Sequence, residues 1–389
     1  MNNKINIGLF NDTFYPMVDG VVEVLNNYAK RLSEFANVYV FVPFIPGQTY
    51  DDTKLSYKVI RCKSIKVPFL DYSLPLPKLD KEFKKEIKKY DLDIIHIHSP
   101  FTLGAFGINY AKKHNIPVIA TMHSQFKQDF KRAVKFDFLA NILNKLVVIK
   151  KFNKCDLCIA VSNEVARIFY EDYGYKTMPQ VLNNATDMLP IKKDNYINKL
   201  YNLNKDTKVF LFVGRLNKLK NIFFIAESIK ILKDKNPNFK FKMLFVGTGQ
   251  DKEELKEYIK NNNLEDDIIL CGKVIDRDIL AKYYKRADLF LFPSKYDASS
   301  LVQVEAASQG TPTVFIENTA TSNNITNNVN GFITKDSPND YANKIIEVIN
   351  NNKLYQEVSK NCFHDLYITW DEVVEKLYKI YQEKINDFK

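Results

Sequence analysis

Two acidic side chains near residue 300 have a spacing suited to binding a nucleotide and a sugar. Asp297 lies in a loop after a predicted strand, and Glu305 lies eight residues later in the helix that follows. Ser299 or Ser300 can cap this helix, whose first backbone amides then form a site for an anion. Glu305 lies roughly 7–8 Å further along the helix axis. Pyrophosphate on the amides, ribose hydroxyls on Glu305 and sugar hydroxyls on Asp297 would fit this arrangement. The spacing alone does not favour this interpretation over a capped helix with an exposed glutamate.

A second group of charged side chains follows another predicted strand. Arg215 and Lys220 are five residues apart in the sequence VGRLNKLKNI. A guanidinium and an ammonium form charge-assisted hydrogen bonds with phosphate, and they can stabilise the charge that develops on a diphosphate leaving group. The segment therefore suits a diphosphate site. The alternative is a solvated basic turn, which is the interpretation of Lys218.

Short apolar segments alternate with amphipathic ones through both halves of the chain. Alternation of this kind predicts parallel sheets covered by helices on both faces. The expected strands are 5–10, 38–43, 94–98, 117–122 and 157–162, and then 208–216, 241–249, 267–272, 289–294 and 311–316. The expected helices include 21–32, 106–114, 221–234, 251–262, 277–286 and 301–309.

The polar segment 189–208 separates the two halves and is interpreted as a linker. A length of 389 residues also indicates about two domains. The predicted fold class is therefore α/β, with two doubly wound, Rossmann-like domains facing a central cleft. We place the first domain at 1–186 and the second at 187–367. Ligands are expected in the cleft, at the carboxyl ends of the strands.

Composition limits the class of protein and its compartment. No apolar run approaches the roughly 18 residues of a transmembrane helix, and the start of the chain predicts a strand rather than a signal peptide. Five cysteines are too few for a disulfide framework, so a reducing, cytoplasmic setting is expected. Residues 1–185 carry 26 Lys+Arg against 18 Asp+Glu, most of the net charge of +10. This excess favours an anionic membrane or substrate; without an RNA-binding string or a zinc finger, nucleic acid is not expected.

The segment 126–154 concentrates this charge, with eight Lys+Arg and two Asp. Apolar side chains recur there every four residues, with lysines beside them: Phe126, Phe130, Val134, Phe138, Ile142 and Leu146, flanked by Lys127, Lys131 and Lys135. An apolar helical face with a basic rim is typical of a helix on an anionic bilayer, where each Lys or Arg contributes about 1 kcal/mol. The alternative is a helix that packs this stripe on its own sheet. The first interpretation predicts a peripheral protein at the inner face of the cell membrane.

The string FPSKYDASSLVQVEAASQGTPTV, at 292–314, resembles the Glu-x7-Glu signature of retaining glycosyltransferases of the GT-B fold. The matching residues are Pro293, Ser294, Leu301, Glu305, Ala306, Gly310 and Pro312, whereas Asp297 replaces the first Glu and Ala298-Ser299-Ser300 replaces Gly-Phe-Gly. The segment 213–222 is similar to the G-R-L-x-x-x-K string of the same family. NDTFYPMVDGVVEVL, at 11–25, resembles the opening of bacterial family 4 enzymes, especially diacylglycerol glucosyltransferases.

The resemblance covers nearly the whole chain and implies roles for individual residues. His123, Asp297, Glu305, Arg215 and Lys220 would form the catalytic set, and His123 would contact the sugar or the reacting centre unless it is purely structural. The donor would also meet Gly20, the backbone around Val274, and the helix start at Ser299, Ser300, Leu301 and Val302. His98 is a further candidate, and His96 is interpreted as structural. The C-terminal helix, 368–389, would cross back onto the first domain.

The activity that the resemblance implies is transfer of a hexose from a UDP- or GDP-sugar, with retention of configuration, to a membrane lipid such as diacylglycerol. No metal or other cofactor is expected. One alternative is synthesis of a cell-surface or capsular polysaccharide. Another is a non-catalytic GT-B protein that binds sugar nucleotides, which the altered loop from Asp297 to Ser300 motivates.

Three further patterns have a plain structural interpretation. Asp91-Leu92-Asp93 and Asp276-Arg277-Asp278 match a metal-binding triplet that arises often by chance. Cys155 and Cys158 form a lone CxxC without the second pair that a zinc site needs. Gly247-Thr248-Gly249 lacks the third glycine of a dinucleotide-binding fingerprint, so NAD is not predicted.

Overall fold

The computed structural model describes residues 4–17, 19–48, 50–67, 73–123, 136–295, 297 and 300–388. The chain divides into two compact units. Unit 1 comprises residues 1–184 together with 370–389, and unit 2 comprises 185–369. These divisions lie two residues from the expected boundaries at 186/187 and 367/368.

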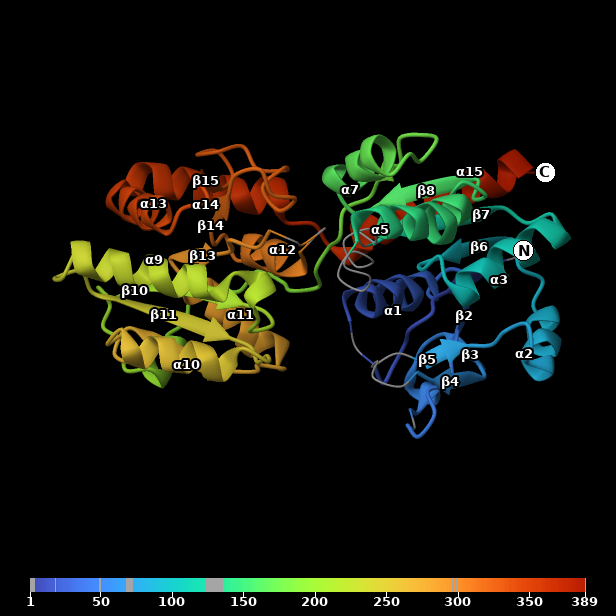
Figure 1. The fold of residues 1–389 in the computed structure, drawn as a ribbon, viewed down its shortest axis with the longest axis horizontal. Coiled ribbons are helices and arrows are strands. Elements are labelled where there is room, and N and C mark those ends of the chain that lie inside the picture. The colour runs from blue at the N-terminus through green and yellow to red at the C-terminus, as the bar shows by residue number, and fades with distance from the viewer. Residues whose placement is uncertain are drawn as a thin grey trace. The chain divides into compact units, whose positions relative to one another are not determined.

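Unit 1 is built on a seven-stranded parallel sheet with the order β3-β2-β1-β6-β7-β8-β9 (Figure 1). Its strands are β1 (Asn6–Phe10), β2 (Asn37–Pro43), β3 (Lys58–Cys62), β6 (Ile94–Ile97), β7 (Val118–Met122), β8 (Leu157–Ala160) and β9 (Gln180–Val181). Strands β4 (Ser64–Lys66) and β5 (Ser73–Pro75) pair antiparallel in a separate two-stranded sheet. The central strands are almost wholly buried, as expected of a parallel sheet that helices cover on both faces.

Several helices of unit 1 begin or end at recognisable sequence signals. They are α1 (Gly20–Leu32), α2 (Lys81–Glu86), α3 (Thr102–His114), α5 (Asp137–Leu143), α6 (Lys150–Phe152), α7 (Asn163–Arg167) and α15 (Trp370–Phe388). Asp19 caps α1 by accepting hydrogen bonds from the amides of Val21 and Val22, both at 2.9 Å. Asn115 ends α3 with a left-handed backbone at φ 55°.

Unit 2 repeats the architecture with a six-stranded parallel sheet of order β12-β11-β10-β13-β14-β15. Its strands are β10 (Lys208–Val213), β11 (Phe241–Val246), β12 (Ile268–Gly272), β13 (Leu289–Leu291), β14 (Thr313–Ile316) and β15 (Phe332–Thr334). Its helices are α8 (Tyr196–Leu200), α9 (Ile222–Lys235), α10 (Lys252–Asn261), α11 (Arg277–Arg286), α12 (Leu301–Ser308), α13 (Pro338–Asn350) and α14 (Asn352–Leu366). The apolar strands and the inner faces of these helices form one core.

Each sheet has a point at which the strand order reverses. In unit 1 this point lies between β1 and β6, and in unit 2 it lies between β10 and β13. Helices that follow the strands on either side of such a point cover opposite faces, so a crevice opens at the carboxyl ends of those two strands. The loops after β1, β6, β10 and β13 are therefore the places to look for ligands.

The C-terminal helix α15 belongs to unit 1, although unit 2 precedes it in the chain (Figure 1). Its Trp370 packs edge-on against Tyr28 of α1, with ring centroids 5.8 Å apart. Its Tyr381 hydroxyl lies 2.6 Å from Nδ1 of His96 in β6. Helix α15 thus completes the core of a domain that begins more than three hundred residues earlier.

The structure differs from the sequence expectations at several elements. The segment 189–208 is not a bare linker, because it contains α8, whose Ile197 is buried in the core of unit 2. Strands β3, β4, β5, β9 and β15 were not expected. Gly247 and Gly249 have a packing role: a Cβ atom would lie 1.9 Å from the carbonyl oxygen of Gly214 in the first case and 2.2 Å from that of Leu216 in the second.

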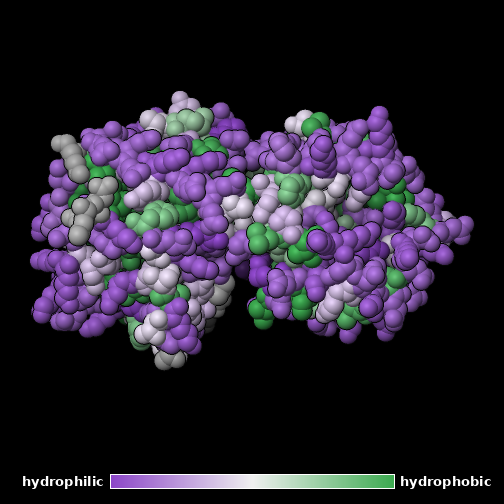
Figure 2. Space-filling view, turned by 180° about the vertical axis from the view of Figure 1, so that it is seen from behind, coloured by the Kyte–Doolittle hydropathy of each residue, from purple (hydrophilic) through white to green (hydrophobic). Residues whose placement is uncertain are grey.

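Within the described part of the chain, every helix is too short or too polar to cross a membrane. Hydrophobic side chains on the face seen in Figure 2 are scattered over a mainly hydrophilic surface. All five cysteines are free thiols, and Cys155 and Cys158 are buried.

Candidate active site

In unit 2, the loops after β10 and β13 meet where the strand order reverses. A single 3₁₀ turn, Lys218–Lys220, follows β10, and the Asn217 side chain caps it by accepting the amide of Lys220 at 3.1 Å. Asn221 then takes a left-handed backbone at φ 60° and donates from its side chain to the carbonyl of Pro293 at 3.1 Å. This bond ties the loop after β10 to the loop after β13.

The side chains of Lys220 and Asp297 form an ion pair across these two loops. Both are largely buried, and the Lys220 ammonium also lies 6.0 Å from the centre of the Phe292 ring. The second carboxylate oxygen of Asp297 and the hydroxyl of Ser294 are buried without a hydrogen-bond partner among the described residues. Buried polar atoms without partners are uncommon, so a ligand group is expected to satisfy them.

The remaining predicted contacts of unit 2 occupy the same end of the sheet. Arg215 is exposed just after β10 and has no ion-pair partner in the described chain. Ser300 holds the N-cap position of α12, but its side chain makes no capping bond. Val274 and Val302 are partly buried and pack against the core, and Leu301 is the first residue of α12. Ser299 lies outside the described residues.

Glu305 is not the exposed glutamate of the alternative interpretation. The residue is 5% exposed, and each carboxylate oxygen has a partner. Oε1 accepts from Arg277 Nη1 at 2.8 Å, and Oε2 accepts from the Tyr284 hydroxyl at 2.9 Å. Burial, followed by the Glu305 charge, raises the pKa of Tyr284 well above its ordinary value. This hydroxyl therefore stays a donor and holds Glu305 in place.

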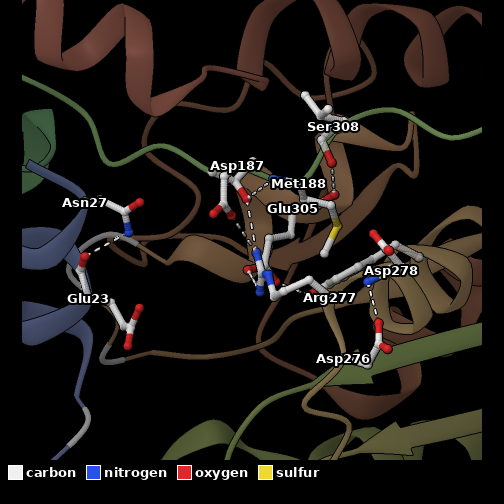
Figure 3. A network of polar contacts seen from close by, with 12 residues as sticks. Glu23, Asn27, Asp187, Met188, Asp276, Arg277, Asp278, Glu305 and Ser308 are labelled. Carbon is white, nitrogen blue, oxygen red and sulfur yellow. Dashed lines mark hydrogen bonds and ion pairs between the residues drawn. The ribbon is translucent and has the colours of Figure 1, made fainter. Parts of the chain in front are cut away.

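Arg277, like Tyr284, is a residue of this site that the sequence patterns did not reveal. Its guanidinium lies between Glu305 and Asp187, and Nη2 is 3.5 Å from Oδ1 of Asp187 and 3.4 Å from Oγ1 of Thr186 (Figure 3). In the sequence, Arg277 stands inside an Asp-Arg-Asp triplet. Asp276 of that triplet caps α11 by accepting from the amides of Asp278 and Ile279, so its role is structural.

In unit 1, a large cavity of about 1140 Å³ opens at the carboxyl ends of β1, β6 and β7. Most of its described lining is apolar, and the polar groups converge from the strand ends. The lining residues used below are Leu74, Leu76, Lys78, His98, Phe101, His123, Val147 and Lys151. Ligand pockets are typically about 300–1,000 Å³, with apolar walls and a few placed polar groups, so this cavity has the character of a binding site for a large apolar ligand.

Three histidines follow one another from the interior of unit 1 to this cavity. His96 is fully buried and bonded on both ring nitrogens, at 2.6 Å to Tyr381 and 2.7 Å to Thr121. His98 Nδ1 lies 3.0 Å from His123 Nε2, and both rings line the cavity. His98 Nε2 is buried without a partner in the described chain. Burial lowers the pKa of His123 to about 3, so the ring is neutral at pH 7.

Asp12 also lines the cavity, and its carboxylate has a structural role. Its carboxylate accepts from Ser99 Oγ at 2.6 Å, Thr102 Oγ1 at 2.7 Å and the Leu103 amide at 2.8 Å. These bonds hold the start of α3 against the loop after β1. Gly20, the other predicted ligand contact of unit 1, has open space where a Cβ would lie, so no protein contact requires a glycine there.

The basic segment lies partly outside the described residues, which exclude Phe126, Phe130, Val134, Lys127, Lys131 and Lys135. Its described part runs through α5, a π-helical turn at Asn144–Ile149, and α6. There the apolar stripe is exposed: Phe138 to 73%, Ile142 to 37% and Leu146 to 59%. In this part of the segment, the stripe does not pack on its own sheet.

The described part of the chain, this site included, holds no cluster of three or more His, Cys, Asp or Glu side chains arranged to bind a metal ion. The expectation that no metal takes part stays a prediction.

Comparisons with known proteins agree with this geometry. Residues 18–188 match the family model described as Glycosyltransferase Family 4, and residues 194–364 match the one described as Glycosyl transferases group 1. The alpha-monoglucosyldiacylglycerol synthase of Streptococcus pneumoniae is 27% identical over 363 residues, covering 89% of this chain and 78% of that protein. The enzyme of the same name from Acholeplasma laidlawii is 27% identical over 329 residues, covering 80% of each.

Solved structures share the fold over the full length. The crystal structure of Anabaena Alr3699/HepE in complex with UDP and glucose superposes with a TM-score of 0.74 at 17% identity, covering 97% of this chain and 99% of that one. The two matched family models together span most of the sequence. The two parallel sheets are doubly wound, and their strand order reverses at the loops that carry the motifs. The chain belongs to the family 4 glycosyltransferases of the GT-B fold.

Proposed function

We propose that this glycosyltransferase moves a hexose from a UDP- or GDP-sugar to a membrane lipid, of which diacylglycerol is the first candidate, with retention of configuration at the anomeric carbon. The observation that carries the proposal is the apolar cavity of unit 1, which is large enough for lipid chains. The names of the two relatives that glucosylate diacylglycerol support the same acceptor class.

The donor is proposed to bind at the strand reversal of unit 2. Arg215, Lys220 and the free amides at the start of α12 would hold the diphosphate, because cations and helix N-termini both favour an anion. Glu305 would accept hydrogen bonds from the ribose hydroxyls, and the base would lie against the backbone around Val274. The Anabaena structure, whose name states bound UDP and glucose, supports a nucleotide sugar as donor.

The ion pair between Lys220 and Asp297 suggests how the site prepares for this donor. An incoming diphosphate offers Lys220 a second, doubly charged partner, while Asp297 keeps an unpaired oxygen for sugar hydroxyls. A cation held in place before the donor arrives costs little reorganisation at the moment of reaction.

The proposed step breaks the bond between the anomeric carbon and the phosphate oxygen, and the nucleoside diphosphate leaves with the electron pair. The acceptor hydroxyl oxygen forms the new bond from the same face, and its proton passes to the departing phosphate oxygen. Arg215 and Lys220 stabilise the charge that develops on the diphosphate, so the proposal includes no metal ion. Neutral His123 would contact the sugar.

The exposed stripe of α5 and the following π-helical turn supports a peripheral location at the inner face of the cell membrane. Exposed apolar side chains with lysines beside them, such as Lys145 and Lys150, fit an anionic bilayer surface. A lipid acceptor has to be reached at that surface.

The proposal is tested by incubating the purified protein with UDP-glucose, UDP-galactose, UDP-N-acetylglucosamine and GDP-mannose, together with a membrane-lipid extract, and identifying products by mass. One donor is expected to give a hexosylated lipid. Transfer only to a water-soluble glycan would replace the lipid acceptor by a polysaccharide. Donor binding without transfer or hydrolysis would indicate a non-catalytic protein.

A further inference from the structure

Two lysines line the cavity of unit 1, the exposed Lys78 and the partly buried Lys151, and neither has an anionic partner among the described residues. Lys78 lies in the loop after β5, and Lys151 lies in α6. Neither forms an ion pair with any residue in the described part of the chain. Most of the wall around them is apolar, with Leu74, Leu76 and Val147 among its members, and the carboxylates of Asp12 and Asp19 also line the cavity. An uncharged lipid would leave the partly buried Lys151 without an anionic partner.

Lys151 is partly buried. The carboxylate that acts on its charge is Asp12, whose oxygens already accept hydrogen bonds from other groups. Burial lowers the pKa of Lys151, as do Lys154 and Lys78, whereas Asp12 raises it. The Asp12 oxygens accept hydrogen bonds from Ser99, Thr102 and the amide of Leu103 at the start of α3. Asp12 therefore interacts with Lys151 through its charge and not through a hydrogen bond. A partly buried cation without a bonded partner is unfavourable, and an anion in the cavity would remove that penalty.

We propose that the acceptor is an anionic phospholipid with a free hydroxyl on its headgroup, bound with its phosphate between Lys78 and Lys151 and its chains along the apolar wall. This inference rests on the proposed function and narrows its acceptor class. The headgroup hydroxyl attacks the anomeric carbon of the donor sugar while the bond between that carbon and the donor phosphate oxygen breaks. The hydroxyl proton goes to the departing diphosphate. The lipid phosphate itself forms and breaks no bond.

The geometry also places a hydrogen-bonding group at the same cavity. The unpartnered Nε2 of His98 and the ring of His123 line it from the strand ends, while the lysines lie on the surrounding loop and helix. A headgroup that carries both a phosphate and a hydroxyl can use both kinds of group. Diacylglycerol has a hydroxyl but no phosphate, so it can form hydrogen bonds with the histidines but no ion pair with the lysines.

The test compares dioleoyl-phosphatidylglycerol with dioleoylglycerol as acceptors in neutral detergent micelles, with products identified by mass. Wild-type protein is expected to have the lower KM for phosphatidylglycerol. Lys151→Gln should raise that KM about tenfold or more, the loss expected for one charge-assisted hydrogen bond, and should change the KM for dioleoylglycerol less than about twofold. Lys151→Arg should restore the wild-type preference, which separates lost charge from damaged folding.

Lys113→Gln is the matched control, because it removes the same charge from an exposed position in α3 that neither lines the cavity nor belongs to the basic segment. A second arm adds dioleoyl-phosphatidic acid, which has the phosphate but no headgroup hydroxyl. Phosphatidic acid should inhibit transfer to phosphatidylglycerol by the wild type, because it competes for the phosphate site. It should inhibit the Lys151→Gln variant much less.

Other outcomes overturn the inference in distinguishable ways. Transfer to dioleoylglycerol with equal or better KM, or equal effects of the Lys113 and Lys151 substitutions, refutes the phosphate site and leaves the lipid glycosyltransferase proposal standing. Transfer to no lipid with any donor refutes that proposal itself.

Discussion

Lys220 and Asp297 form the best-defined contact of the proposed donor site. Their ion pair connects the loops that follow β10 and β13, and an oxygen of Asp297 stays unpaired. Both residues were predicted from motif strings, but the pair itself was not. The strand order brings the two loops together, and a local string does not encode it.

Lys220→Ala should lower kcat/KM at least about a hundredfold, the usual loss when one preorganised donor to a developing charge is removed. Lys218→Ala is the control, since Lys218 is exposed and pairs at the surface with Glu254. Turnover is measured as nucleoside diphosphate release, with thermal unfolding of both variants as a check on folding. Near-normal turnover in Lys220→Ala would remove this residue from the diphosphate site.

Arg277 is predicted to act through Glu305 and not on the donor directly. Arg277→Gln should raise the donor Kd about tenfold, because Glu305 then keeps only Tyr284 as an orienting partner. Arg277→Lys should recover part of the affinity, and the exposed neighbour Asp278→Ala should have little effect. Calorimetric titration with UDP and GDP measures this; an unchanged Kd in Arg277→Gln would show that Glu305 is held without it.

His96 makes the free energy of unfolding of unit 1 depend on pH. Burial lowers the pKa of His96 to about 3, against about 6.5 for a histidine in an unfolded chain. Between these values the unfolded chain binds one more proton at this position. The free energy of unfolding therefore falls as the pH falls, by about 1.4 kcal/mol per pH unit at most for this group.

The measurement is denaturant unfolding at pH 7, 6 and 5 for the wild type, His96→Asn and His364→Asn. His96→Asn should be less stable at pH 7, since it loses the bonds to Tyr381 and Thr121, but should show a shallower pH dependence. His364 is exposed, so its variant should follow the wild type. Parallel curves for all three proteins would contradict the assigned protonation state.

At the scale of elements, the predictable strands were those with continuous apolar runs. KVFLFV forms β10, and five of its six residues are buried. By contrast, KVIRC forms β3 with Lys58 and Arg61 in the strand, and β9 has only two residues, so neither carries an apolar signal. Arg277 was missed for a related reason: it opens an ordinary amphipathic helix, and its partner Glu305 lies two elements later in the chain.

The exposed stripe of α5 and the π-helical turn is predicted to bind anionic bilayers. Phe138→Ser with Leu146→Ser should reduce sedimentation with phosphatidylglycerol vesicles several-fold, because two apolar side chains no longer leave water on binding. The control pair is Leu189→Ser with Ile275→Ser, which are comparably exposed in unit 2. If both pairs weaken binding equally, the stripe is no specific membrane contact.

Neutralising Lys127, Lys131 and Lys135 together should add to this loss. The expected contribution is about 1 kcal/mol per charge at low salt, and it should fade as salt is added. Vesicle binding that does not change would leave this segment as a domain surface.

At the scale of the whole molecule, α15 makes unit 1 depend on the end of the chain. Trp370 is buried against α1, and Tyr381 bonds to His96 in the central sheet. Trp370→Ala should lower the free energy of unfolding of unit 1 by about 3–5 kcal/mol, the usual loss for a large buried aromatic. Lys379→Ala, on the exposed face of the same helix, should be nearly neutral. Equal stability of the two variants would contradict the packing described.

The central claim is that the two units together move a sugar onto a lipid. The most direct measurement supplies UDP-glucose, UDP-galactose or GDP-mannose labelled in the sugar, with dioleoylglycerol and dioleoyl-phosphatidylglycerol in micelles, and follows label into the organic phase. The account predicts a lipid product with one donor, with an α-linkage by the coupling of its anomeric proton, and none with Lys220→Ala. Label that stays in the aqueous phase as free sugar or soluble glycan, with every donor, would contradict it.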